Sequence, residues 1–486
     1  MQVLLISTYD LGRQPFGLAS PAAFLRAAGH HVRCVDLTRA KLVEDDVRAA
    51  RLVAFYLPMH TATRLALPVL DRVRTINPSA HICAYGLYAP LNADVLRAHG
   101  ATTILGPEFE NALTDLTQSL AAGDPVGPTF RSGVHESATS SPEDARPDRL
   151  RQGYGESAEA HSAKAEDRTY GSAIGRVSFM PPDRSDLPPL SKYASLQIGD
   201  ERRVVGYTEA TRGCKHRCRH CPIVPVYDGR FRAVDAGVVL SDVRAQVVAG
   251  ARHITFGDPD FFNGPTHALR IVEALAREFP GVSYDVTIKV EHLKNHAALL
   301  PTLRDTGCAF VTCAVESFDD EVLEKLEKGH THADFAGVVA HCRSIGLTLS
   351  PTFVAFTPWT TLDSYVAMLR ELARLEMVPA VSPIQYAIRL LIPDGSRMLE
   401  LADVRAVVRH YDAAALAHVW RHADPRVDAL QRTLERLVGT RLNAPRHEVF
   451  GAVWESAHAA AGLTAPPPEP LLSRAAVPYL NEPWYC

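Results

Sequence analysis

The chain has no long apolar run, no marked excess of either charge and few cysteines, and each absence excludes a class of protein. Among its 486 residues no apolar run approaches a membrane span, and the start Met1-Gln2-Val3 lacks the charged beginning of a signal peptide. Lys plus Arg number 51 and Asp plus Glu number 55, so the net charge is −4 and no basic stripe suggests nucleic-acid binding. Nine cysteines in a chain of this length do not make a disulfide framework. We therefore expect a soluble cytoplasmic protein of two or three domains, with no membrane or nucleic-acid partner.

Three of the cysteines share one short loop, with the spacing Cys-x₃-Cys-x₂-Cys at Cys214, Cys218 and Cys221. Three thiolates can hold three irons of a [4Fe–4S] cluster, whose usual complement is four cysteines, so one iron stays open to a small molecule. The basic residues between the cysteines favour thiolates and offset the charge of a cluster. The alternative is a non-catalytic zinc- or ligand-binding protein, in which His216 or His220 would supply the fourth zinc ligand.

This spacing is the motif of the radical S-adenosylmethionine enzymes, and the chain resembles that family. In the family the open iron binds the amino and carboxylate groups of S-adenosylmethionine, and an electron from the cluster cleaves a carbon–sulfur bond. The resemblance implies a [4Fe–4S] cluster on Cys214, Cys218 and Cys221, S-adenosylmethionine as cofactor, and an electron donor such as flavodoxin or ferredoxin. One departure is His220, because the family usually has an aromatic residue there that packs against the adenine.

Residues 1 to about 122 alternate short apolar runs with helical patterns, which predicts a doubly wound parallel sheet of the flavodoxin or cobalamin-binding type. The predicted strands are Val3–Ser7, Val32–Val35, Leu52–Phe55, His81–Tyr85 and Thr103–Leu105. This part resembles the cobalamin-binding-like domain that precedes the radical domain in many family members. Neither the D-x-H-x-x-G motif that supplies a histidine to cobalt nor the phosphate-binding G-x-G-x-x-G is present. Cobalamin is therefore a candidate cofactor, and a retained fold without cobalamin is the alternative.

The rest of the chain divides into four further segments. Residues 123–178 carry few large apolar groups and are expected to form a flexible linker or insertion. Residues 179–395 hold a proline-rich lead-in and six strand–helix units, which predict the partial (β/α)₆ barrel typical of the family. The six predicted strands are Val204–Thr208, His253–Phe256, Tyr284–Lys289, Ala309–Val315, Leu347–Val354 and Pro383–Leu391. Residues 396–462 are expected to form a helical region interrupted at Pro425, and residues 463–486 a flexible tail ending in Cys486.

Polar residues follow several of the barrel strands, and chemistry in such barrels lies at the carboxyl ends of the strands. The candidate cofactor-binding residues are Gly257, Asp258, Lys289, Glu291, Glu316 and Arg389. By resemblance, Asp258 stands where the family contacts the amino group of S-adenosylmethionine, and Glu316 corresponds to a glutamate near the bound cofactor. Lys289 and Glu291 are candidates for ribose and carboxylate contacts. A helix cap or a structural ion pair is the alternative for such residues.

The end of the chain narrows the resemblance to the CUAEP/CCAEP-tail radical S-adenosylmethionine proteins, whose sequences continue past "PWYC" with cysteine or selenocysteine and then Ala-Glu-Pro. We hypothesise that the codon after Cys486 is UGA for selenocysteine, which the gene sequence beyond codon 486 would test. The 24 residues from 463 onward could extend about 80 Å, so Cys486 could reach the barrel mouth as a catalytic thiol.

The leading interpretation is a radical S-adenosylmethionine enzyme that modifies a small molecule. A related family from arsinothricin biosynthesis moves the 3-amino-3-carboxypropyl group of S-adenosylmethionine onto trivalent arsenic, and a terminal thiolate suits a soft acceptor. The expected reaction is therefore 3-amino-3-carboxypropyl transfer to a soft acceptor. Cobalamin-dependent radical methylation is the enzymatic alternative.

Overall fold

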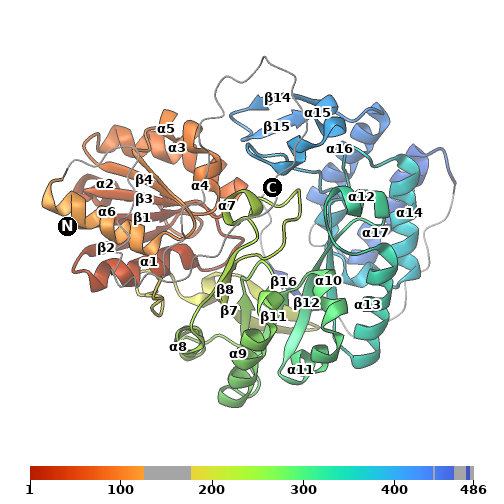
Figure 1. The fold of residues 1–486 in the computed structure, drawn as a ribbon, viewed down its shortest axis with the longest axis horizontal. Coiled ribbons are helices and arrows are strands. Elements are labelled where there is room, and N and C mark those ends of the chain that lie inside the picture. The colour runs from red at the N-terminus through yellow and green to blue at the C-terminus, as the bar shows by residue number, and fades with distance from the viewer. Residues whose placement is uncertain (125–176, 442–443, 465–477, 482–486) are drawn as a thin grey trace, which may run out of the picture.

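The first part of the chain folds into a five-stranded parallel sheet with helices on both faces (Figure 1). In this computed structural model, residues 1–124, 177–441, 444–464 and 478–481 are described. The strands are β1 (Gln2–Ser7), β2 (His31–Asp36), β3 (Leu52–Tyr56), β4 (His81–Tyr85) and β5 (Thr103–Leu105), in the order β2-β1-β3-β4-β5. Each ends within one residue of its predicted bounds. The sequence predicts them well because parallel strands are buried on both faces and are therefore continuous apolar runs.

Two separate cores lie on the two faces of this sheet. The helices are α1 (Phe16–Ala27), α2 (Glu44–Ala49), α3 (His60–Ile76), α4 (Tyr88–Leu91), α5 (Ala93–Ala98) and α6 (Glu110–Ala122). One core packs Leu4 and Phe55 against α3, and the other packs Leu5 and Tyr85 against α1 and α6. The predicted doubly wound architecture is confirmed.

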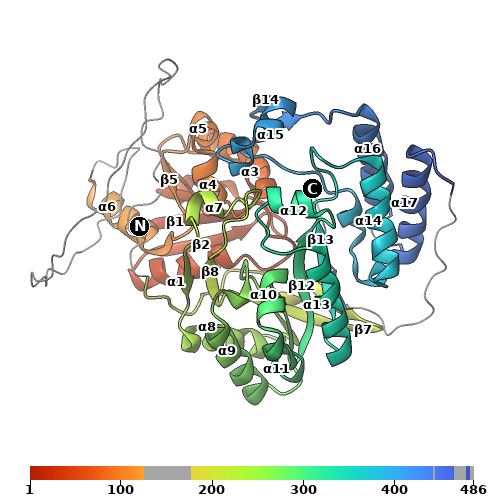
Figure 2. The ribbon, with the colours of Figure 1, turned by 45° about the vertical axis from the view of Figure 1, so that its right-hand side comes forward.

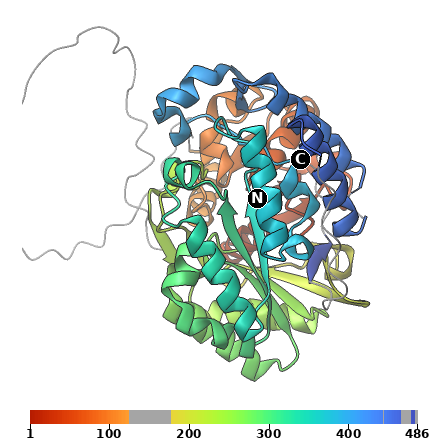
Figure 3. The same ribbon diagram turned by 90° about the vertical axis from the view of Figure 1, so that its right-hand side faces the viewer.

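The second sheet has seven strands, five of which are parallel and curl into an open barrel (Figure 3). The parallel strands are β7 (Glu201–Thr208), β10 (His253–Phe256), β11 (Ser283–Thr287), β12 (Cys308–Glu316) and β13 (Leu349–Phe353). The helices that follow them are α8 (Ala236–Val248), α9 (Pro265–Glu278), α10 (Val290–Asn295), α11 (Leu300–Asp305), α12 (Asp320–Lys325), α13 (His332–Ile345) and α14 (Leu362–Arg374). Helix α9 buries Ala268, Ile271, Val272 and Leu275 at helical spacing against the main core.

The sixth predicted strand, Pro383–Leu391, is present only in part. A 3₁₀ turn takes Pro383–Tyr386, and the following segment pairs with the chain after β13 through one parallel bridge between Phe356 and Arg389. The prediction of a full strand is wrong because Pro383 has no N–H to donate to a ladder and its fixed φ suits the start of the turn. The partial barrel is otherwise as predicted.

Antiparallel strands that the sequence did not reveal close one edge of the barrel sheet. Strand β6 (Ser195–Ile198) pairs with β7, and β16 (Tyr479–Asn481), from the tail, pairs with β6. The predicted linker lies mostly outside the described residues, and Cys486 lies outside them.

The C-terminal region is helical with one hairpin. Its elements are α15 (Ala402–Val407), β14 (Val408–Asp412), β15 (Ala417–Trp420), α16 (Pro425–Gly439) and α17 (Arg446–Ala460). Pro425 does not interrupt a helix but begins α16, behind an Asp424 cap, where a proline without an N–H is tolerated. Figure 2 shows α16 and α17 beside α14, and both helices add to the main core.

The hairpin β14–β15 also joins the C-terminal region to the first sheet. Leu416 lies in the core on the α3 face, and His60 Nε2 lies 2.5 Å from the carbonyl oxygen of Ala415. Among the described helices, none is long and apolar enough to cross a membrane.

Candidate functional site

The cysteine loop, residues 213–222, follows β7 and the short strand β8 (Thr211–Gly213) at the carboxyl end of the barrel. Gly213 has φ +75°, and a Cβ there would lie 2.5 Å from the carbonyl oxygen of Arg230, so only glycine fits this turn. Asn263, after β10, holds the loop by accepting from the backbone N–H of Lys215 at 3.1 Å and donating to the Gly213 carbonyl at 3.1 Å. The backbone N–H of Arg219 donates to the carbonyl of Leu326 at 2.9 Å. The loop is therefore fixed to two other barrel units, those that follow β10 and β12.

The three predicted cluster cysteines are free thiols, with Cys218 buried and the other two half-buried. Burial raises the pKa of Cys214 to about 12 and that of Cys221 to about 11. A metal must therefore displace protons to bind here, as it does at cysteine sites in general.

Glu316, predicted at the end of the fourth barrel strand, contacts the cysteine loop. It has φ +69° beside a register shift in β12, and this bend directs its carboxylate inward. Its Oε1 lies 3.2 Å from Nζ of the buried Lys328 and 3.4 Å from Nε2 of His220. Burial alone would raise the pKa of Glu316, but the charges of Lys328 and His220 lower it to about 2. Glu316 therefore connects β12 to the residue that precedes Cys221.

Lys289 and Glu291, at the start of α10, also reach the loop. Lys289 Nζ lies 2.7 Å from Glu291 Oε2 and 3.3 Å from Nδ1 of His216. Burial, together with Lys289 and His292, lowers the pKa of His216 to about 4, so its imidazole is neutral at pH 7. Three predicted residues, Lys289, Glu291 and Glu316, are thus brought to the cysteines.

Gly257 and Asp258, which follow β10, contact the residues that lead into the cysteine loop. Asp258 accepts from the backbone N–H of Ala210 at 3.0 Å and from the Thr211 hydroxyl at 2.6 Å. Burial raises the pKa of Asp258 to about 7. A Cβ on Gly257 would lie 1.8 Å from the hydroxyl of the buried Tyr207, so the glycine allows this ring to pack.

Arg389 is held away from the cysteine loop. Its guanidinium donates to Asp428 at 2.8 Å and to the carbonyl of Trp420 at 2.9 Å, and lies 3.5 Å from the centre of the Trp420 ring. These contacts join the barrel to the hairpin and to α16. Arg389 therefore forms a structural ion pair, the alternative that the sequence left open for such residues.

Several polar groups around the loop were not among the predicted cofactor-binding residues. Buried side-chain atoms without a hydrogen-bond partner in the described structure include Nδ1 of His220, both ring nitrogens of His330, Nδ1 of His292 and Oδ2 of Asp260. Buried polar atoms are nearly always paired, so unpartnered atoms in the cysteine loop and at the barrel ends beside it are typical of a site that binds a polar ligand. His330 lies in the segment between α12 and α13, and its place soon after the fourth barrel strand was the available signal.

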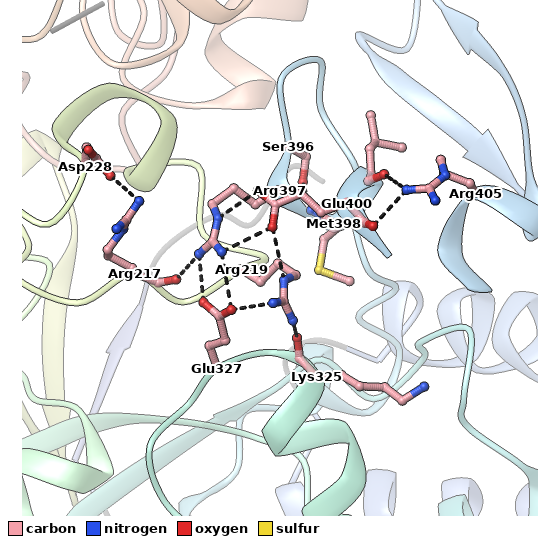
Figure 4. A network of polar contacts seen from close by, with 11 residues as sticks. Arg217, Arg219, Asp228, Lys325, Glu327, Ser396, Arg397, Met398, Glu400 and Arg405 are labelled. Carbon is pink, nitrogen blue, oxygen red and sulfur yellow. Dashed lines mark hydrogen bonds and ion pairs between the residues drawn. The ribbon is translucent and has the colours of Figure 1, made fainter. Parts of the chain in front are cut away.

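A second group of charges holds the outer side of the cysteine loop (Figure 4). Arg219 donates to Glu327 and to the carbonyl of Lys325, and Arg397 donates to Glu327 at 2.7 Å and to the carbonyl of Arg217 at 2.7 Å. The loop is therefore joined to the segment that leads into α15.

A third group connects the loop to the first sheet. Arg212, in β8, makes a bidentate pair with Glu110 of α6 at 2.6 and 2.8 Å, and contacts Glu209 at 2.8 Å. Glu110 is fully buried and also accepts from the Ser20 hydroxyl at 2.6 Å. The first domain thus contacts the residues next to the cysteines through a buried ion pair.

A cavity of about 340 Å³ adjoins Glu316 on its other side. It lies between the carboxyl ends of β12 and β13 and helix α14, and its polar lining includes His332 and Glu371. His332 Nε2 lies 2.6 Å from Glu371, so one polar pair faces this space.

Comparison with known proteins identifies the barrel. Residues 208–371 match the model of the Radical SAM superfamily. The chain is 28% identical over 183 residues to tRNA-2-methylthio-N(6)-dimethylallyladenosine synthase of Chlorobium luteolum, a match that covers 35% of this chain and 40% of that protein. It is 24% identical over 170 residues to ribosomal protein uS12 methylthiotransferase RimO of Desulfosudis oleivorans, covering 34% of this chain and 38% of that one. The chain thus spans about two fifths of the length of these curated relatives.

Solved structures match a larger share of the chain. The cobalamin-dependent S-adenosylmethionine radical enzyme OxsB, with aqua-cobalamin and S-adenosylmethionine bound, gives a TM-score of 0.67 at 14% identity, over 90% of this chain and 66% of that one. The radical S-adenosylmethionine methyltransferase TsrM of Kitasatospora setae gives 0.58 at 16% identity, over 84% and 77%. At these identities the likeness establishes the fold, in which a doubly wound sheet precedes a radical barrel.

The chain therefore carries the domain of a radical S-adenosylmethionine enzyme, and this domain implies a [4Fe–4S] cluster and S-adenosylmethionine. The enzyme interpretation is favoured over the non-catalytic zinc-binding one. The ligand residues and the domain boundaries stay predictions. Because the curated relatives are named for tRNA and a ribosomal protein, the absence of a nucleic-acid partner also stays a prediction.

Proposed function

We propose that Cys214, Cys218 and Cys221 hold a [4Fe–4S] cluster and that the enzyme cleaves S-adenosylmethionine reductively to modify a small molecule. The observation that carries this proposal is the group of unpartnered buried polar atoms beside three free thiols at the carboxyl end of the barrel. When bound, the cluster would supply the electron for cleavage of a carbon–sulfur bond. We further propose a cytoplasmic location and a flavodoxin or ferredoxin as electron donor.

The chain's own residues would bind and orient the cofactor. Lys289 offers a buried ammonium group for the carboxylate of S-adenosylmethionine, and Glu291 and Glu316 offer carboxylates for its amino and ribose groups. Gly257 and Asp258 would act by holding the loop, since their contacts are with Tyr207, Ala210 and Thr211. For Arg389 the structural contacts favour a supporting role.

The finer proposal is transfer of the 3-amino-3-carboxypropyl group to a soft acceptor, with Cys486 as the acceptor's thiol ligand, as in a CUAEP/CCAEP-tail protein. The register of the tail strand supports it. Asn481 pairs with Ser195, which pairs with Val204, and β16 runs in the same direction as β7, toward the cysteine loop. From Val204 to Thr208 the strand covers about 13 Å, and the five residues after Asn481 can span about 17 Å. Cys486 is therefore within reach of the carboxyl end of the barrel.

Cobalamin-dependent methyl transfer is the second candidate, and the likeness to OxsB and TsrM over most of the chain favours it. The packing at the carboxyl edge of the first sheet argues against it. The rings of Tyr56, Tyr85 and Phe109 lie within 4.8–5.9 Å of one another there, and a Cβ on Gly17 would lie 2.1 Å from the Tyr56 ring. This part of the edge is occupied by its own side chains, so a corrin could not take their place without rearrangement.

Product analysis tests the proposal. The protein, reconstituted anaerobically with iron and sulfide, is incubated with S-adenosylmethionine and dithionite, and the adenosine products are identified by mass. We expect methylthioadenosine from wild type and from Cys342→Ala, which removes a buried thiol outside the loop, and no product from Cys218→Ala. Formation of 5′-deoxyadenosine instead would contradict aminocarboxypropyl transfer, and a requirement for added methylcobalamin would support the second candidate.

A further inference from the structure

Three side chains beside the cysteine loop meet at one point although they come from different parts of the barrel. His216 lies in the loop, Asp260 follows β10, and His292 lies in α10. Asp260 and His292 are 1% and 3% exposed, and His216 is half-buried. One ligand atom from each residue can be chosen so that all three lie within 4.8 Å of one another.

The two histidines share a hydrogen bond, but it does not continue as a chain to Asp260. His216 Nε2 lies 3.0 Å from His292 Nε2, and Asp260 Oδ2 lies 2.9 Å from His292 Nδ1. Since the two ring nitrogens of an imidazole point in widely divergent directions, partners aligned with both would stand far apart. Instead the His216 and Asp260 atoms are 3.7 Å from each other, on the same side of the His292 ring.

The close contact between Asp260 and His292 also fails as a hydrogen bond. Oδ2 and Nδ1 are each buried without a hydrogen-bond partner despite their separation of 2.9 Å. Hydrogen bonds require alignment as well as distance. Both atoms belong to side chains that are more than nine-tenths buried, and a ligand atom of His216 lies within 4.8 Å of them. A bound cation would satisfy this arrangement.

The donor set suits a divalent transition ion. Two imidazoles and one carboxylate bind zinc or ferrous iron at about 2.0–2.2 Å, which places neighbouring ligand atoms about 3–3.5 Å apart. The His216 and Asp260 atoms are 3.7 Å apart, and one nitrogen of His292 lies within 4.8 Å of both, so small side-chain movements would bring the three atoms to these distances. The other carboxylate oxygen of Asp260 accepts from the backbone N–H of Phe262 at 3.0 Å, which orients the group. Lys289 brings a positive charge near His216, which would oppose cation binding, but Glu291 pairs with the Lys289 ammonium group at 2.7 Å and offsets that charge.

We propose that His216, Asp260 and His292 form a second metal site, distinct from the three cysteines, for a divalent ion of the zinc or ferrous class. The ion would tie the segment between Cys214 and Cys218 to β10 and α10, with remaining coordination positions open to water or substrate. The site does not depend on the cluster, because none of its ligands is a cysteine.

Zinc retention tests the site. The protein is loaded with Zn²⁺, both as isolated and after anaerobic cluster reconstitution and removal of free iron, then desalted and analysed for zinc, iron and sulfide. In the reconstituted form, whose loop cysteines are occupied, we expect about one zinc per chain, with an X-ray absorption shell of nitrogen and oxygen at about 2.0–2.1 Å. The form as isolated can bind a further zinc on its three free thiols. Asp260→Asn and His292→Ala should each lower retained zinc at least tenfold while leaving the iron and sulfide contents unchanged.

A histidine on the same helix gives a matched control. His296→Ala changes an imidazole one turn from His292, outside the three ligands, and should retain zinc as the wild type does. The proposal is overturned if wild-type protein keeps no zinc, or if Asp260→Asn and His292→Ala keep it. It is also overturned if the absorption spectrum of the reconstituted form shows zinc bound by sulfur alone, which would place the zinc on the cysteines. The absorption spectrum is measured on the wild type, so the identity of the zinc ligands is tested even where a variant fails to fold.

Discussion

The buried ion pair between Arg212 and Glu110 provides the most demanding prediction about how the two domains are joined. The Arg212 and Glu110 side chains are 6% and 0% exposed, and the guanidinium also packs over the rings of Phe16, Phe109 and Phe179 at 4.9–5.6 Å. Arg212→Met keeps much of this packing but leaves the carboxylates of Glu110 and Glu209 buried without their cation.

Removal of one partner from a buried pair costs about 3–5 kcal/mol, because the remaining charge is uncompensated. At 1.4 kcal/mol per factor of ten, the opening of the contact between α6 and β8 should become roughly 100-fold to 4,000-fold more favourable. We expect faster hydrogen exchange in α6 and in the cysteine loop, together with a lower unfolding temperature in calorimetry. The double variant Arg212→Met/Glu110→Gln should recover part of the loss, since a buried charge is removed with its partner.

An exposed pair supplies the matched control. Arg48 and Glu44 are 55% and 44% exposed at 2.6 Å, so Arg48→Met should cost no more than about 1 kcal/mol and leave exchange in α6 unchanged. If Arg212→Met behaves like Arg48→Met, or if the double variant is the less stable one, then the ion pair does not hold the domains together.

Three further predictions follow from other residues. Because the pKa of Glu316 falls to about 2 beside Lys328, the pairing of Glu316 stabilises the fold above about pH 4.5, and this stabilisation is lost as the pH falls toward 2. In acid titrations followed by circular dichroism, the wild type should therefore lose about 3 kcal/mol more of its free energy of unfolding than Glu316→Gln. Equal losses in the two proteins would refute this prediction. Gly257→Ala should destabilise the protein by about 1–3 kcal/mol in thermal denaturation, because its Cβ would lie 1.8 Å from the hydroxyl of the buried Tyr207. Gly264→Ala, whose Cβ would lie 3.7 Å from its nearest neighbour, should change the stability little, and equal effects of the two substitutions would show that Tyr207 moves aside. Arg389→Ala should lower the unfolding temperature but leave the Kd for S-adenosylmethionine within about twofold in calorimetric titration, and a tenfold weaker Kd would return this residue to the cofactor site.

Most of the fold could be predicted because its strands are buried apolar runs. The strands of the first sheet and the first five of the barrel carry this signal. The hairpin β14–β15 could not be found in this way, since Arg409, His410 and Tyr411 are half-buried or exposed and lack an apolar run. The sixth strand failed for the opposite reason, because an apolar run begins with a proline that turns.

The candidate site could be predicted where a residue directly follows a strand. Glu316 and Lys289 are of this kind, and the structure brings both to the cysteine loop. Groups that act across long sequence separations were missed, such as Asp260 with His292, because nothing local marks two polar residues as neighbours in space. Arg389 shows the converse, since a polar residue near a barrel end can be fully occupied by a distant partner.

The central claim is that the three loop cysteines hold a cluster that binds S-adenosylmethionine, and electron paramagnetic resonance of the reconstituted, dithionite-reduced protein tests it most directly. The account predicts about four irons and four sulfides per chain, and the signal of a reduced [4Fe–4S] cluster that shifts when S-adenosylmethionine is added. Cys218→Ala should lose the signal, and Cys342→Ala should keep it. A colourless protein with one zinc on the cysteines, or a cluster signal that ignores S-adenosylmethionine, would contradict the account.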